Sequence, residues 1–195
     1  MLPDTLITER LVVRPFLRDD LREIHRILDQ SFGAGSLTAD PQALAARQSW
    51  LEWSMLNSEW FPRMQQVTYG DRAVALQENG KLIGSVGYVP FAGPFYRIPG
   101  MGGSPDFNSL ELGLFWVIDE PFRGNGYAAE AGRAMLEAAF FHLGIPRVIA
   151  TTEFDNAASQ AVMRKLGMRV ERNPTGEPEW LQVVGWADNP GWGQS

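Results

Sequence analysis

The sequence contains no cysteine, which excludes disulfide bonds, a thiolate nucleophile and any metal site built on cysteine. It has only two histidines, His25 and His142, which lie far apart on two expected helices and do not match the ligand spacing of a zinc site. From these two shortages we expect no metal centre and no mechanism that passes through a cysteine.

Long apolar runs and clusters of basic residues are also missing. No segment approaches the roughly 20 apolar residues that span a bilayer, and residues 1–14 lack the apolar stretch of a signal peptide. Lysine and arginine total 17 against 23 acidic residues, a net charge of -6, whereas nucleic-acid-binding domains usually carry a basic patch. We therefore expect a cytoplasmic protein that binds neither nucleic acid nor membrane.

The apolar residues that are present follow strand and helix periods over most of the 195 residues, a length that suits one domain. We expect that domain to cover residues 1–187, followed by a C-terminal tail at 188–195. Asn79-Gly80, between two apolar runs, is a strong hairpin signal. The expected strands are residues 6–15, 72–77, 82–89, 110–118, 147–152, 168–171 and 180–186. We expect four helices: one that starts near residue 20, and three at residues 40–62, 127–143 and 156–166.

The order of these elements indicates the fold class. Hairpins come first and strand–helix alternation follows, so we predict an α/β fold with one mixed sheet whose N-terminal strands are antiparallel. Residues 93–107 contain four glycines and three prolines and are expected to form a long loop.

Residues 110–143 are the segment that indicates a function. They are expected to form a buried strand, a glycine-rich turn and a helix. A helix start leaves about four backbone N–H groups unpaired and places roughly half a positive charge there. Gly124 and Gly126 lack side chains, so an anion can approach the backbone closely, and Arg123 adds a full charge. The turn is therefore predicted to bind a phosphate group, although it lacks the P-loop pattern.

A dinucleotide-binding protein is the rival interpretation of this turn. Gly124, Gly126 and Ala129 match the dinucleotide fingerprint, and Glu153 follows the next strand. A Rossmann unit normally begins its domain, whereas hairpins precede the motif here. Too few residues follow to complete a doubly wound sheet, so this alternative is less favoured.

Two motifs resemble those of the GNAT superfamily of N-acyltransferases. Arg123, Gly126 and Ala128 match the family's pyrophosphate motif, and residues 156–167, which begin Asn-x-x-Ser and end Lys-Leu-Gly, are similar to a second family helix. Residues 8–15 resemble the first strand of the branch that includes the ribosomal-protein N-terminal alanine acetyltransferases. The paired motifs occur in the family's order and separation.

The resemblance implies helices on both faces of a sheet that splays open after the strand at 110–118, with coenzyme A bound in the split. Backbone groups of Trp116, Val117 and Ile118 would pair with the pantetheine arm. Asn156 would contact that arm or the thioester neighbourhood. The amides that would hold the pyrophosphate belong to Gly124, Asn125, Gly126, Tyr127 and Ala128, with Arg123 beside them.

Amine acylation needs a base for the acceptor ammonium, a donor for the oxyanion and in some cases a proton for the departing thiolate. Glu111 is the candidate base, because it is the one charged side chain in the run 110–118. The resembling branch often has an acidic residue two positions before a glycine, here Gly113. An arginine-paired or solvent-facing carboxylate is the alternative.

Ser159 is the candidate acid or thiolate hydrogen-bond donor. A hydroxyl that only satisfies an amide in the first turn of its helix is the alternative. Many members of the resembling family carry a tyrosine one turn later, where this sequence has Met163. The tyrosine of those family members is therefore absent here, which leaves Ser159 as the candidate.

The predicted function is an acetyl-CoA-dependent N-acetyltransferase in which a primary amine attacks the thioester directly in a ternary complex. The acceptor would be a small-molecule amine or a protein N-terminus, and the chain would be a monomer or homodimer. The alternative from another class is a coenzyme A-binding sensor or interaction domain without catalysis.

Overall fold

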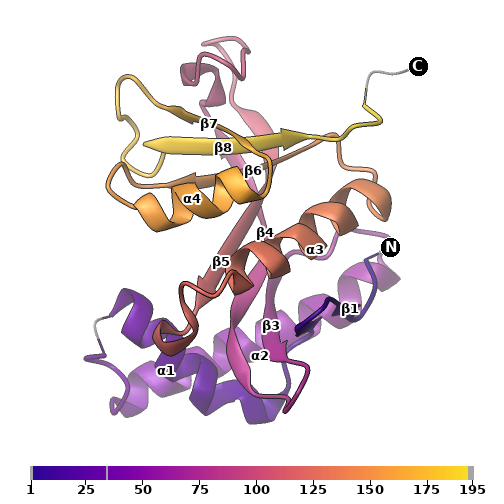
Figure 1. The fold of residues 1–195 in the computed structure, drawn as a ribbon, viewed down its shortest axis with the longest axis vertical. Helices are drawn as coiled ribbons and strands as arrows, with labels where there is room; N and C mark the ends of the chain where they lie inside the picture. The colour runs from indigo at the N-terminus through magenta and orange to yellow at the C-terminus, as the bar shows by residue number, and fades with distance from the viewer. Residues whose placement is uncertain (1, 34, 193–195) are drawn as a thin grey trace.

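A computed structural model of the chain describes residues 2–33 and 35–192. Within them the backbone forms one eight-stranded sheet, in the order β1-β2-β3-β4-β5-β6-β8-β7, and four α-helices (Figure 1). Every neighbouring pair of strands is antiparallel except β5 and β6, so the sheet is mixed as predicted. The strands are β1 (Leu6–Ile7), β2 (Leu11–Arg14), β3 (Gly70–Leu76), β4 (Leu82–Gly93), β5 (Ser109–Ile118), β6 (Arg147–Thr152), β7 (Arg169–Arg172) and β8 (Val183–Asp188), and the helices are α1 (Leu21–Phe32), α2 (Pro41–Arg63), α3 (Tyr127–Phe141) and α4 (Ala157–Lys165).

Helices cover both faces of the sheet, as predicted. Val74 and Ile118 belong to the buried cluster that contains Met135 of α3. Their neighbours along the strands, Ala73 and Val117, belong to a second cluster with side chains of α1 and α2. Because side chains alternate between the two faces of a strand, α3 lies on one side of the sheet and the α1–α2 pair on the other (Figure 1).

The prediction of one first strand at residues 6–15 is wrong. The chain instead forms a short antiparallel hairpin of β1 and β2. The polar triplet Thr8-Glu9-Arg10 makes the turn, and the Thr8 amide donates to the Leu11 carbonyl at 2.9 Å. The hairpin predicted at Asn79-Gly80 is confirmed, since it joins the antiparallel strands β3 and β4.

β4 is longer than the strand predicted at residues 82–89. β4 continues to Gly93, where it still pairs with Ser109 at the start of β5, so the predicted loop begins one residue later. The loop contains a short 3-10 turn, η2 (Phe95–Arg97), and folds back toward the sheet. Phe95 packs there with Ile149 and Trp186, so the loop covers one face of β6 and β8.

Two predicted boundaries are wrong near prolines and turns. α2 includes Pro62 and ends at Arg63, because a proline in the final turn removes only one helical hydrogen bond. β8 occupies Val183–Asp188, because Asn173 donates to the Leu181 carbonyl at 2.8 Å and holds the preceding residues in a turn. The last three residues of the predicted tail, 193–195, lie outside the described residues.

No helix in the described part of the chain is long and apolar enough to cross a bilayer. The longest of the helices given above, α2, has 23 residues, and charged side chains interrupt it.

Asp71 on β3 is a partly buried acidic side chain on the face of the sheet that the α1–α2 layer covers. It accepts a hydrogen bond from the Ser85 hydroxyl at 3.1 Å and has no ion-pair partner within the described residues. Burial raises the pKa of Asp71 to about 7, and the Ser85 hydrogen bond and the charge of Arg47 oppose this only in part.

Replacing Asp71 with asparagine should therefore make stability less dependent on pH. The unfolded chain loses this proton near pH 4 but the folded chain keeps it to about pH 7, so the wild-type free energy of unfolding falls across that interval. We expect Asp71→Asn to be more stable than the wild type by about 2–4 kcal/mol at pH 8, with the difference shrinking as the pH falls toward 4. Urea denaturation at several pH values measures it, and a pH-independent difference would contradict the assignment.

Candidate active site

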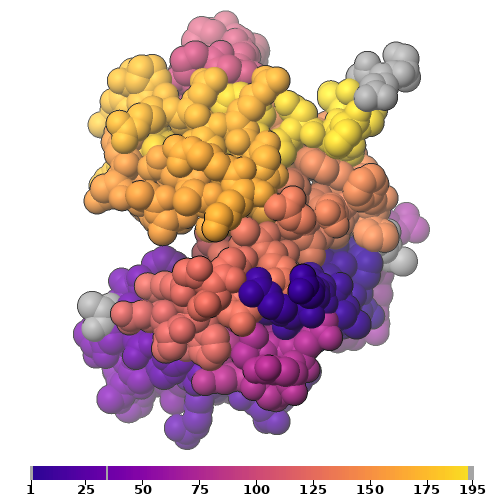
Figure 2. Space-filling view, in the orientation of Figure 1, coloured from indigo at the N-terminus to yellow at the C-terminus, as the bar shows by residue number. Residues whose placement is uncertain are grey.

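The sheet splits between its two central strands. β5 and β6 pair in parallel only at Leu112 with Val148 and at Gly113 with Ile149. Beyond that point residues 114–118 pair only with β4, and residues 150–152 pair only with β8. The edge of β5 that faces β6 is therefore left without a strand partner. Figure 2 shows the surface hollowed between α4 and the segment just before α3.

The three residues predicted to pair with a pantetheine arm lie on this unpaired part of β5. Trp116 is half-buried, and Val117 and Ile118 are buried on opposite faces of the sheet. The Ile118 carbonyl accepts a hydrogen bond from Arg123 Nε at 2.8 Å, so it is already engaged. The remaining backbone groups of this edge are the ones open to an extended ligand.

The turn after β5 has the backbone that an anion site needs. Gly124 and Gly126 adopt φ values of 81° and 85°, which disfavour any residue with a side chain. Gly126 is the N-cap of α3, and no side chain caps that helix. Within the described residues no carbonyl or side chain accepts from the amides of residues 124–128. These donors and the helix dipole therefore face outward together.

Arg123 ties the turn to its surroundings. Besides Ile118, its guanidinium donates to the Ser31 hydroxyl of α1 at 3.0 Å. Asn125 closes the turn by donating its side-chain amide to the carbonyls of Phe122 and Arg123, at 3.2 and 3.1 Å. The side chains of Arg123 and Asn125 thus hold the turn, while the amides stay available.

Arg10 supports the same turn, and sequence reasoning missed it. Its guanidinium pairs with Glu130 in the first turn of α3 at 2.6 Å and donates to the Asn125 carbonyl at 3.1 Å. It also lies 4.5 Å above the Tyr127 ring, so that ring packs against Arg10. Partial burial opposes ionisation of Glu130, but hydrogen bonds from Thr8 and Arg10 outweigh it and lower the pKa of Glu130. No spacing rule links residue 10 to residue 125, so only the folded chain reveals the contact.

The start of α4 holds Asn156 and Ser159. The Asn156 side chain caps the helix by accepting from the Ser159 amide at 3.0 Å, and its amide group donates to Glu153 at 3.4 Å. The Ser159 hydroxyl has no partner in the part of the chain that the structure describes, so it does not satisfy a backbone amide. Met163, one turn later, is fully buried, with its sulfur against Gly185 of β8.

Glu111 lies at the closed end of the split. It comes one residue before Leu112, which packs toward α3, so the Glu111 side chain points to the opposite face. The side chain is 8% exposed and accepts from Arg147 Nε at 3.2 Å. Glu111 is thus paired with an arginine, which was the alternative to its role as a base. The Glu111–Arg147 pair also borders a cavity.

A cavity of about 270 Å³ separates Glu111 from the loop after β4. Beside it, the Phe91 ring lies against Gly113, where a Cβ would be 2.4 Å from the ring, and it stacks on Trp180 at 5.5 Å. An apolar wall and a carboxylate therefore meet at the closed end of the split. The cavity is lined by Phe95, Tyr96, Met101, Gly102, Gly103, Ser104, Phe107, Asn108, Ser109, Glu111 and Arg147.

Among residues 2–33 and 35–192, no three histidine or acidic side chains gather in a way that could hold a metal ion.

A parallel pair of strands that separates, followed by a helix start with open amides, suits an extended ligand that carries a phosphate group. A family model described as an acetyltransferase (GNAT) domain matches residues 10–169. The chain therefore belongs to the GNAT acetyltransferase family. Membership implies acetyl-CoA as co-substrate, and the open turn and unpaired edge of β5 fit that molecule.

A curated relative supports the assignment to this family. The uncharacterized N-acetyltransferase YnaD of Bacillus subtilis (strain 168) is 33% identical over 106 residues, 52% of this chain and 54% of the relative. The matched segment thus spans about half the length of that curated relative.

Solved structures match over nearly the whole chain. An acetyltransferase from Agrobacterium tumefaciens has a TM-score of 0.66 and 26% identity, covering 96% of this chain and 95% of that one. A ribosomal-protein-S5-alanine acetyltransferase from Vibrio fischeri has a TM-score of 0.63 and 15% identity, covering 96% and 98%. The second match shows the fold alone.

Proposed function

We propose that this chain is an acetyl-CoA-dependent N-acetyltransferase whose acceptor is a primary amine. The observation that carries the proposal is the split of β5 from β6, with the open amides of residues 124–128 at its mouth and a buried carboxylate, Glu111, at its closed end. One end suits a diphosphate and the other suits an ammonium group.

The proposed reaction is a direct transfer. The acceptor ammonium loses a proton to Glu111, directly or through a water molecule, and the neutral nitrogen attacks the thioester carbonyl. The C–N bond forms, the C–S bond breaks, and the departing thiolate takes up the second proton that the nitrogen loses, so coenzyme A leaves as the thiol. The Ser159 hydroxyl, which has no partner in the described chain, would donate a hydrogen bond to that sulfur. No enzyme nucleophile is required, in keeping with a sequence that has no cysteine.

The acceptor would approach from the face of the sheet opposite α3. Glu111 points to that face and borders the cavity of about 270 Å³ next to the Phe91–Trp180 stack. A cavity of this size suits the amino end of a small molecule or of a protein chain. Both acceptor classes remain within the proposal.

Thiol release separates a catalyst from a sensor. Acetyl-CoA is mixed with a panel of polyamines, amino acids, aminoglycosides and peptides with free N-termini, and free coenzyme A is measured. We expect amine-dependent release with at least one class. Saturable binding of acetyl-CoA without release for any amine would favour the coenzyme A-binding sensor instead. A rise in melting temperature with NAD but not coenzyme A would favour the dinucleotide alternative.

Ser159→Ala tests the proposed leaving-group contact. We expect kcat to fall about tenfold, because one hydrogen bond to a developing charge is lost, while KM for acetyl-CoA changes little. Stability should be unchanged, because Asn156 and not the Ser159 hydroxyl caps α4. The contrasting variant is Asn156→Ala, which should lose about 1 kcal/mol in the free energy of unfolding. Unchanged kcat in Ser159→Ala would remove that hydroxyl from the mechanism.

A further inference from the structure

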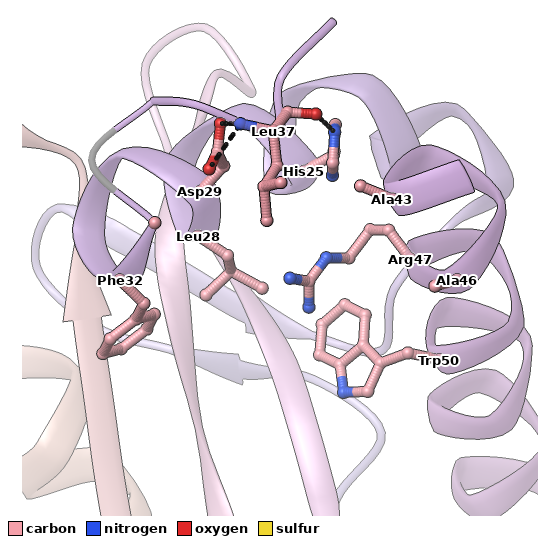
Figure 3. A pocket seen from close by; sticks show the side chains of 10 residues that line it. His25, Leu28, Asp29, Phe32, Leu37, Ala43, Ala46, Arg47 and Trp50 are labelled. Atoms are coloured by element: carbon pink, nitrogen blue, oxygen red, sulfur yellow. Dashed lines mark hydrogen bonds between the residues drawn. The ribbon is translucent and has the colours of Figure 1, made fainter. Parts of the chain in front are cut away.

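A second cavity, of about 400 Å³, lies between α1 and α2 (Figure 3). None of the residues around it belongs to the proposed active site. Its walls are mostly apolar, and three of its side chains are ionisable. The lining residues are His25, Leu28, Asp29, Phe32, Gly33, Leu37, Ala43, Ala46, Arg47 and Trp50.

Arg47 brings a positive charge into this cavity without a counter-ion. Its guanidinium extends from α2 between Leu28 and Trp50 and lies 4.9 Å from the Trp50 ring (Figure 3). Nε is buried and has no hydrogen-bond partner, and the structure gives the side chain no ion pair within the described residues. Burial lowers the pKa of Arg47, and the charges of Asp71 and Asp29, neither of which forms an ion pair with it, oppose this only in part.

The acid that lines the cavity does not neutralise Arg47. The two carboxylate oxygens of Asp29 accept from the Leu37 amide at 3.2 and 3.1 Å, and one of them also accepts from the Thr38 hydroxyl. These hydrogen bonds hold the segment between α1 and α2 against α1. The Thr38 hydrogen bond lowers the pKa of Asp29 despite desolvation, which keeps the carboxylate charged in that role.

His25 contributes a second polar atom without a partner. Its Nε2 faces the Leu37 carbonyl at 3.2 Å, which assigns the proton to that nitrogen. Nδ1 is then an acceptor, and it is buried with no hydrogen-bond partner in the described chain. In Figure 3 the ring points from the Leu37 carbonyl toward the interior of the cavity. The cavity thus offers a charged donor and a neutral acceptor that the protein leaves unused.

A cation without a counter-ion on a partly buried side chain, and buried polar atoms without partners, are costly, and native proteins normally satisfy such groups with a ligand, an ion or water. We propose that the cavity binds a small organic carboxylate with an apolar body, its carboxylate held by Arg47. The planar guanidinium fork suits a carboxylate, and Leu28, Phe32 and Trp50 provide the apolar walls. This site goes beyond the acetyl-transfer function and does not depend on it.

Two probes of nearly equal shape test the proposal on the full chain. The binding of 3-phenylpropionate and of 3-phenylpropionamide is measured by isothermal titration calorimetry. We expect the acid to bind saturably and the neutral amide to bind at least about tenfold more weakly, because a charge-assisted hydrogen bond is worth more than a neutral one. Equal binding of the two probes, or no saturable binding of the acid, overturns the proposal on the wild type alone.

Two arginine variants then locate the charge. Arg47→Gln should remove the preference for the acid, whereas the control Arg63→Gln should keep it. Arg63 lies on the same helix and also stacks on a tryptophan, Trp60, at 5.1 Å, but it is outside the cavity. Unchanged melting temperature and acetyl-CoA binding would show that both variants fold. A preference for the acid that survives in Arg47→Gln contradicts the assignment.

Discussion

Replacing Gly124 with leucine is expected to weaken acetyl-CoA binding about a hundredfold or more while leaving the protein folded. A Cβ at this position would meet no atom within 4 Å, so the structure has room for the leucine side chain. We expect that side chain to hinder a phosphate group from reaching the neighbouring amides of residues 124–128. Loss of two charge-assisted hydrogen bonds, each worth roughly 1.5–3 kcal/mol, is enough for that effect.

Gly144→Leu is the matched control for Gly124→Leu. Gly144 also has a positive φ, 64°, and a Cβ there would likewise meet no atom within 4 Å, but this glycine follows the opposite end of α3. Both variants should lose about 1–2 kcal/mol of stability from the strained backbone. Only Gly124→Leu should lose acetyl-CoA affinity in calorimetric titration. Equal affinities for the two variants would place the pyrophosphate elsewhere.

Replacing Glu111 with glutamine is expected to lower kcat about 10²–10⁴-fold, the range in which general-base catalysis contributes. The amide keeps the shape of the carboxylate, and its oxygen can still accept from Arg147, so the cavity should be preserved. The Kd of acetyl-CoA should not change.

Glu171→Gln controls for indirect effects of the Glu111 change. Glu171 accepts from the Gly100 amide at 2.9 Å, so it also contacts the loop after β4, yet it does not line the cavity. It should keep nearly wild-type kcat. If Glu111→Gln retains full activity, or if both variants lose activity equally, Glu111 is not the base.

The sequence predicts the parts of the fold that local patterns encode. The Asn79-Gly80 hairpin, the buried strand β5 and the helix after Gly126 follow from turn chemistry, apolar runs and a glycine-rich helix start. The reversal at residues 8–10 does not, because three polar residues are compatible with an edge strand as well as with a turn. The resemblance to the GNAT family supplied the split of the sheet, which no local period encodes.

Some features of the candidate site can also be predicted from local sequence, whereas others depend on packing. Gly124 and Gly126 are visible in the sequence because a positive φ restricts the residue type. The contact of Arg10 with Asn125 and the orphan charge of Arg47 depend on packing between segments far apart in the chain. The sequence predicts an arginine partner for Glu111 only as an alternative and does not indicate Arg147, since that pairing depends on how β5 and β6 align.

A crystal structure of the chain with coenzyme A tests the central claim most directly. The account predicts diphosphate oxygens about 3 Å from the amides of residues 124–128 and the pantetheine arm along the unpaired edge of β5. Coenzyme A bound elsewhere, with no ligand atom at that turn, would contradict it.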